Sequence, residues 1–453
     1  MKIRKLKRGN SRKSKTPKPS SRISLLLNQA HSCIKYGRLV QAEDICREIV
    51  NLSPRTSEAY NILGLIYQER GLIDDAISLL HKSVELDDSN PNAFFNLGTI
   101  LGQRGQYEQA VTSLRKGLAL APRTAEARNN LGLALVGLGK LNEATISLEK
   151  AIELDPHYGD AWLSLGDVHC RQGQYQKAVN AYQRCIRFLP DFVEAHYNLS
   201  IAQHDLKLLP DAIESLQRTI ELDPEHTAAH HMLAALSGET PDNAPQQFVT
   251  NLFDQYSGSF ETDLVNRLEY KIPTLLRDLL SEYITVGTRF SKAIDLGCGT
   301  GLSGQAFHDI VDYLAGIDIS KKMLEQAKGK EIYDALLAGD LCEQLHQLPD
   351  LFNLFIATDV MIYIGNLEPL FSTVSSKASP GAYFAFSVES QQQNDFTLQP
   401  TGRYAHAAAY ISRLAAASDF TVIAQKQAGI RKEGDTWIPG EIYILQKNTV
   451  DSN

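Results

Sequence analysis

Small and apolar residues recur with a period of 34 between Ile23 and His226, in six blocks without insertion. Position 20 of every block is alanine, and position 8 is always alanine, glycine or serine. Glycine at position 15 and proline at position 32, each in five blocks, predict a turn between two helices and the end of the second. Small residues at two fixed positions let paired helices approach closely. The pattern predicts six helix pairs, followed by a capping helix over 227–237.

The six blocks resemble the tetratricopeptide repeat (TPR) family, over nearly half of the chain. The resemblance implies an α solenoid, a right-handed superhelix of helix pairs over 23–237 with a concave groove. In this family position 6 tends to face the groove, where a ladder of asparagines can hold an extended peptide. The alternative is that asparagine only tolerates a solvated helical face. We expect a protein or peptide partner in the groove; position 6 is asparagine in four blocks (Asn28, Asn96, Asn130 and Asn198).

Two segments separate the repeats from the second half of the chain. Residues 238–247 are polar, with two prolines and a glycine, and predict an interdomain linker. Residues 248–290 have a helical pattern, in which Tyr256 and Phe260 share one face. Such aromatics form either core or a lid over a ligand, and both interpretations stay open.

From Lys292 to residue 450, short apolar runs alternate with helical patterns, which predicts a doubly wound α/β domain. Glycine recurs directly after the first apolar run, at Gly297, Gly299 and Gly301. A side chain there would keep the backbone away from a ligand, and the next helix points its amide-rich end at the same spot. A nucleotide-type cofactor site is therefore expected near residue 300. Residues 299–304 also fit G-x-G-x-x-G, the pattern of a nicotinamide-dependent oxidoreductase.

Three carboxylates favour a different cofactor. Asp295 stands two residues before the first glycine, where it would repel a pyrophosphate and attract an ammonium group. Asp318 ends the second apolar run, placed to accept hydrogen bonds from ribose hydroxyls. Asp340 follows the third run and could accept one from an adenine amino group.

These residues belong to motifs at the ends of the first four strands: Asp295-x-Gly-x-Gly-x-Gly301, Gly316-Ile-Asp318-Ile-Ser320, Gly339-Asp340 and Ala357-x-Asp359-Val. The motifs resemble those of the class I S-adenosylmethionine-dependent methyltransferases, over about 248–447. Two further stretches are similar to bacterial predicted methyltransferases that carry TPR repeats ahead of the catalytic domain: Phe253-Asp-x-Tyr256 and Gly402-Arg-Tyr-Ala-His406.

The resemblance implies a Rossmann-like fold, with a seven-stranded sheet whose last strand is antiparallel, and S-adenosylmethionine as cosubstrate. Its methionine end would lie on the glycine loop, its ribose on Asp318, its adenine between Asp340 and Leu341, and Tyr256 would close the pocket. The residues expected at the cofactor are Asp295, Gly297, Cys298, Gly299, Gly301, Asp318, Ile319, Asp340, Leu341 and Tyr256.

Three residues near the carboxyl ends of the strands are candidates for catalysis: Asp359, Tyr363 and His406. A hydroxyl or amine acceptor benefits from a general base, whereas a carboxylate acceptor needs none. His406 leads because histidine titrates near neutrality. Each has a structural alternative, with Asp359 as a helix cap, Tyr363 in the core and His406 on the surface.

Charge is unevenly distributed along the chain. Residues 1–22 hold ten Lys or Arg and no acid, so the remainder has 35 basic against 53 acidic residues. This segment is predicted to be a disordered basic tail, through which alone nucleic acid could bind, or simply a solvated tail. His226, His230 and His231 have helical spacing, but no carboxylate or thiol completes a metal site, and none is expected.

Six scattered cysteines and the lack of a long apolar run indicate a cytoplasmic protein with reduced thiols and no membrane span. Two functions compete for such a chain. The first is a methyltransferase whose repeats recruit a partner or substrate. The second is a repeat scaffold whose domain binds S-adenosylmethionine without catalysis. The methyl acceptor cannot be read from the sequence.

Overall fold

The computed structural model describes residues 19–257, 260–261, 264, 268–433 and 436–449. It divides into two compact units, the first ending at Leu208 and the second beginning at Leu209. Most of the predicted basic tail, residues 1–18, lies outside the described residues. Residues 19–22 already belong to the first helix.

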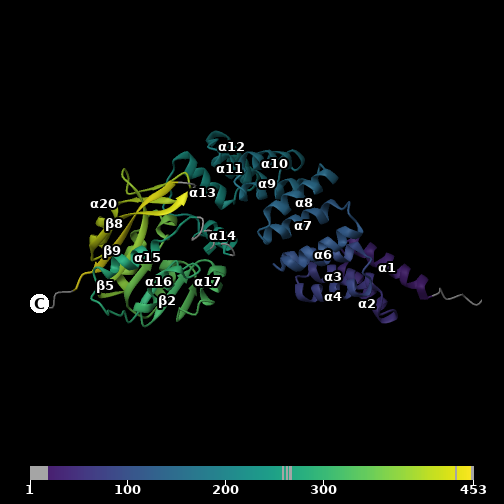
Figure 1. Cartoon of the computed structure of the whole chain (residues 1–453), viewed down its shortest axis with the longest axis horizontal. Coiled ribbons are helices and arrows are strands. Elements are labelled where there is room, and N and C mark those ends of the chain that lie inside the picture. The colour runs from purple at the N-terminus through teal and green to yellow at the C-terminus, as the bar shows by residue number, and fades with distance from the viewer. Residues whose placement is uncertain (1–18, 258–259, 262–263, 265–267, 434–435, 450–453) are drawn as a thin grey trace, which may run out of the picture. The chain divides into compact units, whose positions relative to one another are not determined.

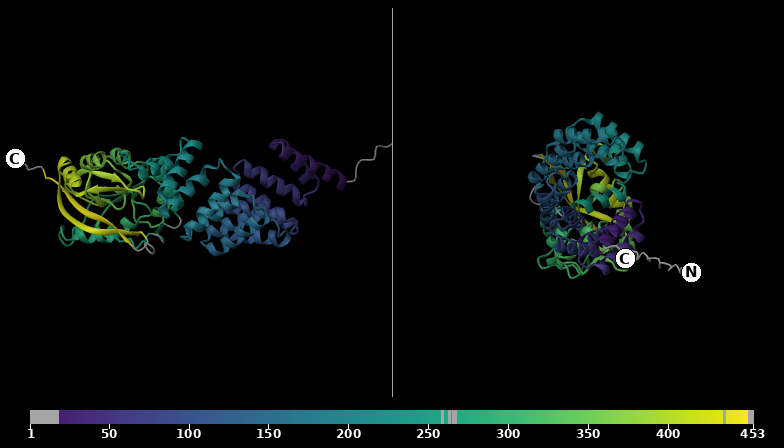
Figure 2. Two further views of the ribbon diagram at one scale, coloured as in Figure 1. Left: turned by 90° about the horizontal axis from the view of Figure 1, so that it is seen from above. Right: turned by 90° about the vertical axis from the view of Figure 1, so that its right-hand side faces the viewer.

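The first unit contains five consecutive helix pairs, which follow one another along the array in Figure 1 and Figure 2, and the first helix of the sixth repeat. Its helices are α1 (Pro19–Lys35), α2 (Leu39–Leu52), α3 (Ser57–Glu69), α4 (Ile73–Leu86), α5 (Pro91–Gln103), α6 (Tyr107–Leu120), α7 (Ala125–Gly137), α8 (Leu141–Leu154), α9 (Gly159–Arg171), α10 (Tyr175–Phe188) and α11 (Val193–Asp205). The glycines at position 15 have φ between 70° and 79°, so they make the turns within the pairs as predicted (Gly37, Gly71, Gly105, Gly139 and Gly173).

Close helix packing explains the small residues of the repeat. A Cβ added to Gly98 in α5 would lie 2.5 Å from Cγ of Leu114 in α6. The alanines at position 20 are fully buried in all six blocks (Ala42, Ala76, Ala110, Ala144, Ala178 and Ala212). The predicted α solenoid is confirmed.

Three of the position-6 asparagines connect the first helices of neighbouring repeats. Asn96 Nδ2 donates to Asn61 Oδ1 (2.9 Å), Asn130 Nδ2 donates to Thr99 Oγ1 (2.9 Å), and Asn198 Nδ2 donates to Asp167 Oδ1 (3.1 Å). Since an amide has two donor hydrogens and an acceptor oxygen, these bonds use only part of its capacity. The peptide ladder stays a prediction beside this structural role.

The second unit begins with α12 (Leu209–Leu222), α13 (Thr227–Ser237) and α14 (Gln246–Tyr256). A mixed sheet follows, in which β1 (Ala293–Leu296), β2 (Leu314–Asp318), β3 (Ala335–Ala338), β4 (Phe352–Ala357) and β5 (Ala378–Gln391) are parallel in the order 3-2-1-4-5. The final strand β9 (Thr436–Lys447) pairs antiparallel with β5 and with β8 (Phe420–Glu433). These seven strands confirm the predicted methyltransferase-type sheet.

Two short strands extend the sheet beyond the seven predicted. β5 continues past the end of β4, so its last residues 389–391 pair with β7 (Tyr404–Ala407). β6 (Phe396–Leu398) pairs antiparallel with β7. Nine strands are therefore found among the described residues.

Helices cover both faces of the sheet, as Figure 1 shows. They are α15 (Ile272–Ser281), α16 (Leu302–Phe307), α17 (Lys321–Lys328), α18 (Leu341–Gln347), α19 (Glu368–Lys377) and α20 (Ala408–Ala417), with short 3₁₀ turns at His308–Ile310 and Met361–Tyr363. One apolar core includes Phe355, Phe371 and Phe384, and a second includes Leu276, Leu314 and Ile444. Covered parallel strands explain why the first four runs lack polar alternation.

The segment predicted as a linker, 238–247, pairs with the loop that follows β4. Ala244 N–H donates to the carbonyl of Tyr363 (3.1 Å), and Asn366 N–H donates to that of Asp242 (2.7 Å). Ala234 and Ala235 of the capping helix α13 share a small core with Leu398 and Tyr404. The helix and the segment after it thus pack within the second unit.

Candidate functional site

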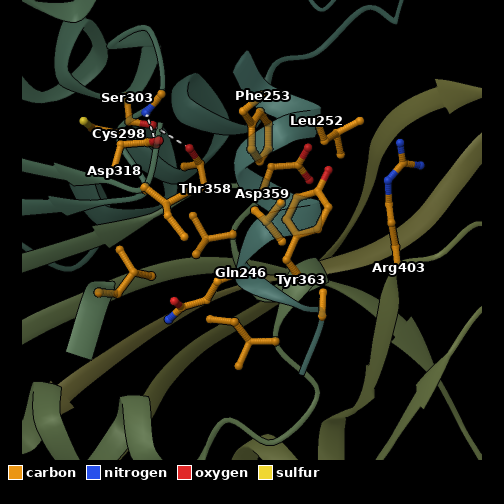
Figure 3. A pocket seen from close by; sticks show the side chains of 18 of the residues that line it. Gln246, Leu252, Phe253, Cys298, Ser303, Asp318, Thr358, Asp359, Tyr363 and Arg403 are labelled. Atoms are coloured by element: carbon orange, nitrogen blue, oxygen red, sulfur yellow. Dashed lines mark hydrogen bonds between the residues drawn. The ribbon is translucent and has the colours of Figure 1, made fainter. Parts of the chain in front are cut away.

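A cavity of about 580 Å³ lies at the carboxyl ends of the parallel strands, beside α14. Its wall includes nine residues predicted to act at the site: Gly297, Cys298, Gly299, Asp318, Ile319, Asp340, Leu341, Asp359 and Tyr363. Figure 3 shows Cys298 and Asp318 at one end of this cavity, Asp359 and Tyr363 towards its middle and Arg403 at the other end.

The glycine loop forms one wall of the cavity. Gly297 has φ 71°, and a Cβ there would lie 2.4 Å from Cγ2 of Val360. The amides of Gly297 and Cys298 both donate to the carbonyl of Ile317, which fixes the loop to the end of β2. Gly301, with φ 95°, precedes α16 and does not line the cavity. Only glycine meets the conformational demand at these turns.

Asp318 supports the glycine loop from the end of β2. Its Oδ2 accepts the Gly299 N–H (2.9 Å), and its Oδ1 accepts the Ser320 N–H (2.8 Å). Burial raises the pKa of this carboxyl, against the backbone hydrogen bonds from Ser320 and Gly299. Each carboxylate oxygen has two lone pairs, so Asp318 can still accept hydrogen bonds from a ligand in the cavity.

Asp340 caps the N-terminus of α18. Its Oδ1 accepts the N–H groups of Cys342 (2.9 Å) and Glu343 (3.0 Å), and its Oδ2 accepts from Gln246 Nε2 (3.1 Å). The residue therefore joins the loop after β3 to the first turn of α14. Leu341 lies beside it on the cavity wall, and its packing against an adenine ring stays a prediction.

Asp295 lies behind the glycine loop rather than on the cavity wall. It is fully buried, and Oδ2 accepts a hydrogen bond from the hydroxyl of Tyr333 (2.7 Å). Burial raises the pKa of Asp295 to about 7. Asp295 is therefore not on the cavity wall, where the sequence predicted a contact with the cofactor.

Helix α14 forms the roof of the cavity. Asp254 Oδ1 accepts a hydrogen bond from Ser320 Oγ (2.6 Å), which ties the helix to the end of β2. Leu252 and Phe253 line the cavity. The rings of Phe253 and Tyr363 pack edge to face, with their centroids 5.3 Å apart. The side chain of Tyr256, predicted to close the pocket, lies outside the described residues.

Asp359 takes part in a buried ion-pair cluster. Arg431 Nη1 donates to Asp359 Oδ1 (2.9 Å) and Oδ2 (3.1 Å), while Nη2 donates to Glu389. The Arg431 side chain is only 2% exposed, and Asp359 adopts φ 58°, which is rare for a residue with a side chain. Both carboxylate oxygens of Asp359 are therefore engaged by Arg431.

Sequence reasoning missed both Arg431 and Glu389. They come from β8 and β5, and nothing in the run Gly-Ile-Arg-Lys-Glu of β8 separates Arg431 from the surface-type lysine beside it. Tyr363 lines the cavity, and its catalytic role stays a prediction. Burial raises the pKa of Tyr363, while the nearby Arg403 opposes that shift. Arg403 itself lines the cavity.

His406 is not brought to the cavity. It is fully buried, and Nε2 donates to the carbonyls of Ile364 (2.9 Å) and Gly365 (3.1 Å). Because a carbonyl only accepts, Nε2 carries a proton in this arrangement. Burial lowers the pKa of His406 to about 4. The geometry gives His406 a structural role and not the catalytic one that the sequence favoured.

The three helically spaced histidines have separate partners. His226 Nδ1 accepts the Ala229 N–H at the start of α13, His230 contacts the carbonyl of Pro224, and His231 contacts that of Gly402. No cluster of three or more potential metal ligands occurs in the described part of the chain. None of its helices is long and apolar enough to cross a membrane.

Residues 20–250, just over half of the chain, match the family model described as the cilia and flagella-associated protein 70 C-terminal domain, of the TPR type. The chain belongs to this family. Residues 294–386 match the methyltransferase domain family, a range that contains the glycine loop, Asp318, Asp340 and Asp359. This member of the repeat family therefore carries a class I S-adenosylmethionine-dependent methyltransferase domain. The G-x-G-x-x-G string falls within that domain, so the oxidoreductase interpretation is not supported.

Two curated proteins are similar to part of this domain. The 18S rRNA (guanine-N(7))-methyltransferase of Bos taurus is 36% identical over 73 residues, 16% of this chain and 26% of that protein. Its Mus musculus counterpart is 34% identical over 76 residues, 17% of this chain and 27% of that protein. The chain thus spans about a quarter of the length of these relatives. Among solved structures, MamA is 28% identical, covering 36% of this chain and 95% of MamA, with a TM-score of 0.34.

Proposed function

We propose that this protein is a methyltransferase that holds S-adenosylmethionine in the 580 Å³ cavity, while its repeats recruit the protein that is, or carries, the acceptor. The proposal is supported by the way in which separate predicted cofactor residues line the same cavity. The glycine loop and the carboxylates of Asp318 and Asp340, from three separate strand ends, face one cavity within a methyltransferase domain. A matched glycine string alone would carry far less weight.

The residues present fit this cosubstrate. Gly297, Cys298 and Gly299 give backbone access at one end, Asp318 can accept from paired hydroxyls, and Asp340 and Leu341 offer an acceptor beside an apolar surface. Acidic groups near the loop suit the positive charge of the ammonium and sulfonium groups. When bound, S-adenosylmethionine supplies an electrophilic methyl group on sulfur.

The protein's own contribution is position and exclusion of water. The hydrogen bonds that Ser320 donates to Asp254 and Gln246 donates to Asp340 hold α14 against the strand ends. Leu252 and Phe253 then cover the cavity with apolar surface. Holding an acceptor in line with the methyl group supplies most of the acceleration that such a displacement needs.

The repeats are the proposed recruitment element. The asparagines that link α3, α5 and α7 retain donor and acceptor capacity, which suits main-chain groups of an extended peptide. The cytoplasmic location stays a prediction from the sequence.

Calorimetry with S-adenosylhomocysteine tests the cavity assignment. Asp318→Ala should weaken binding by about 100-fold, because two hydrogen bonds to a charged group are lost. Asp312→Ala is the matched control, since its carboxylate pairs with Arg289 on the surface. Equal affinity for S-adenosylhomocysteine in both variants would contradict the proposed site.

One observation favours the alternative of a domain that binds without catalysis. Asp359, the carboxylate nearest the middle of the cavity, is already paired with Arg431, and His406 lies elsewhere. Release of S-adenosylhomocysteine from S-adenosylmethionine, measured with cell extract as the acceptor source, separates the two functions. Tight binding of the cosubstrate with no turnover would support the scaffold.

A further inference from the structure

We infer that the methyl acceptor is a carboxylate attached to an apolar group, with Arg403 as the residue that holds the acceptor's charge. The inference rests on the proposed methyltransferase function and specifies its substrate class. It follows from the chemistry of the cavity wall opposite the glycine loop, where Arg403 lies beyond Tyr363 and Asp359 (Figure 3).

Arg403 is held on a well-supported turn. Gln399 N–H donates to its carbonyl (2.7 Å), and Gly402 adopts φ 76°. His231 of α13 donates from Nε2 to the carbonyl of Gly402 (2.8 Å), and Met232 packs so closely that a Cβ on Gly402 would lie 3.0 Å from its sulfur. The backbone of Arg403 is thus fixed from both sides, and its guanidinium charge acts on the neighbouring Tyr363.

The cavity wall offers little general-base capacity to an acceptor. Among the described lining residues there is no histidine, lysine or glutamate. Asp318 and Asp340 belong to the cofactor end, and both oxygens of Asp359 accept from Arg431. A hydroxyl acceptor would need a base that the described part of this wall does not supply. A carboxylate arrives already deprotonated at neutral pH.

Charge argues against nitrogen acceptors as well. A protonated amine would be repelled by Arg403 and could not lose its proton readily here. A neutral ring nitrogen needs no base, but methylation would create a cation facing Arg403. The second arginine of the wall, Arg431, is already paired with Asp359 and Glu389. A carboxylate is attracted by an arginine and becomes neutral on methylation, so the product is released easily.

The reaction balances without a proton acceptor. One carboxylate oxygen stays on the Arg403 guanidinium, and the other forms a bond to the methyl carbon as the carbon–sulfur bond breaks. The electron pair of that bond stays on sulfur, which gives a methyl ester and S-adenosylhomocysteine. Leu252, Phe253 and Tyr363 offer the apolar surface against which the rest of the acceptor packs.

The test uses the full-length protein, S-adenosylmethionine with a tritiated methyl group, and an extract of cells from which the gene has been deleted. Methyl esters hydrolyse in alkali to volatile methanol, whereas methyl ethers and methylamines do not. We expect most of the transferred label to be released as methanol. Label that survives alkali would overturn the carboxylate assignment and leave the methyltransferase function standing.

Variants then test the role of Arg403. Arg403→Met should lower label incorporation about tenfold or more, through a higher KM, and Arg403→Lys should retain part of it. S-Adenosylhomocysteine affinity, which also reports correct folding, should stay within about twofold of wild type. Arg413→Met is the matched control, because Arg413 is exposed and paired with Asp395.

Undiminished incorporation by Arg403→Met would overturn the inference. If wild-type protein binds S-adenosylhomocysteine but transfers no label at all, the proposed function fails, and the carboxylate acceptor fails with it. That outcome differs from alkali-stable label, in which transfer occurs to another class of atom.

Discussion

The repeat unit is specified by contacts that recur from block to block, whereas the catalytic unit depends on contacts that occur once. In the repeats, one position fills the same role six times, as the fully buried alanines at position 20 do. In the catalytic unit, a contact of this kind depends on one residue: Arg431 donates to both Asp359 and Glu389. Repetition makes the first unit easy to read from the sequence. Singular, long-range contacts make the second hard to read and more vulnerable to one substitution.

The largest expected effect on stability comes from removing Arg431 from its ion-pair cluster with Asp359 and Glu389. Arg431→Met should lower the free energy of unfolding of the second unit by about 3–5 kcal/mol, because two buried carboxylates lose their partner. Urea unfolding can be followed by the fluorescence of Trp437 in β9, after Trp162 in α9 is changed to Phe. These are the chain's two tryptophans, so each unit keeps its own reporter.

Two comparisons give that measurement its meaning. Arg289→Met removes an exposed ion pair with Asp312 and should change the free energy of unfolding by less than about 1 kcal/mol. Adding Asp359→Asn and Glu389→Gln to Arg431→Met should recover much of the loss, since none of the three charges of this cluster then remains. A loss from Arg431→Met as small as that from Arg289→Met would show that the cluster is not structurally critical.

The repeat unit should respond to one overpacked position with a smaller loss. Gly98→Val places a side chain where even a Cβ would lie 2.5 Å from Leu114, and should cost about 1–3 kcal/mol of unfolding free energy. Gly102→Ala, in the same helix, is the control. Its Cβ would meet Ala110 at an ordinary 3.9 Å, and the higher helix propensity of alanine should leave stability unchanged or raised by up to about 1 kcal/mol. Trp162 fluorescence in a Trp437→Phe background measures both.

What the sequence could predict follows the same division. Repeats, helix pairs, the seven-strand core and the residues along the glycine loop were all recoverable, because each is specified by local pattern. Local pattern could not place His406, whose ring is fixed by carbonyls near residue 365, about 40 positions away. Nor could it show that Asp295 lies behind the loop, because that depends on the distant hydroxyl of Tyr333. The unpredicted β6 and β7 depend on how far β5 extends past β4.

Asp295 makes the stability of the catalytic unit dependent on pH, which can be measured. Burial raises its pKa from 3.8 to about 7, so the folded state holds a proton that the unfolded state has lost between these values. Its contribution to stability is complete below the unfolded pKa and is lost as pH rises through about 7. Asp295→Asn, which keeps an acceptor for Tyr333, should therefore be more stable than wild type at pH 8, by about 2 kcal/mol.

The difference between Asp295→Asn and wild type should shrink steadily as pH falls to 4.5. Urea titrations at both pH values, without added cosubstrate, measure it through Trp437. Asp309→Asn is the control, because its carboxylate is largely exposed beside Arg277. A stability difference between Asp295→Asn and wild type that is the same at pH 4.5 and pH 8 would mean that Asp295 does not titrate in this range.

The smallest effect concerns the asparagines, where the repeats combine structure with a predicted binding role. Asn96→Ala and Asn130→Ala each remove one bond between neighbouring repeats, and should each lower unfolding free energy by about 0.5–1.5 kcal/mol. If the same amides also hold a peptide, the double variant should capture much less partner protein than wild type at a temperature where Trp162 reports an intact array. Asn51→Ala, at an exposed position near the end of α2, should change neither quantity. Reduced stability with undiminished capture would show that these asparagines only connect neighbouring repeats, and that the partner binds to another face of the array.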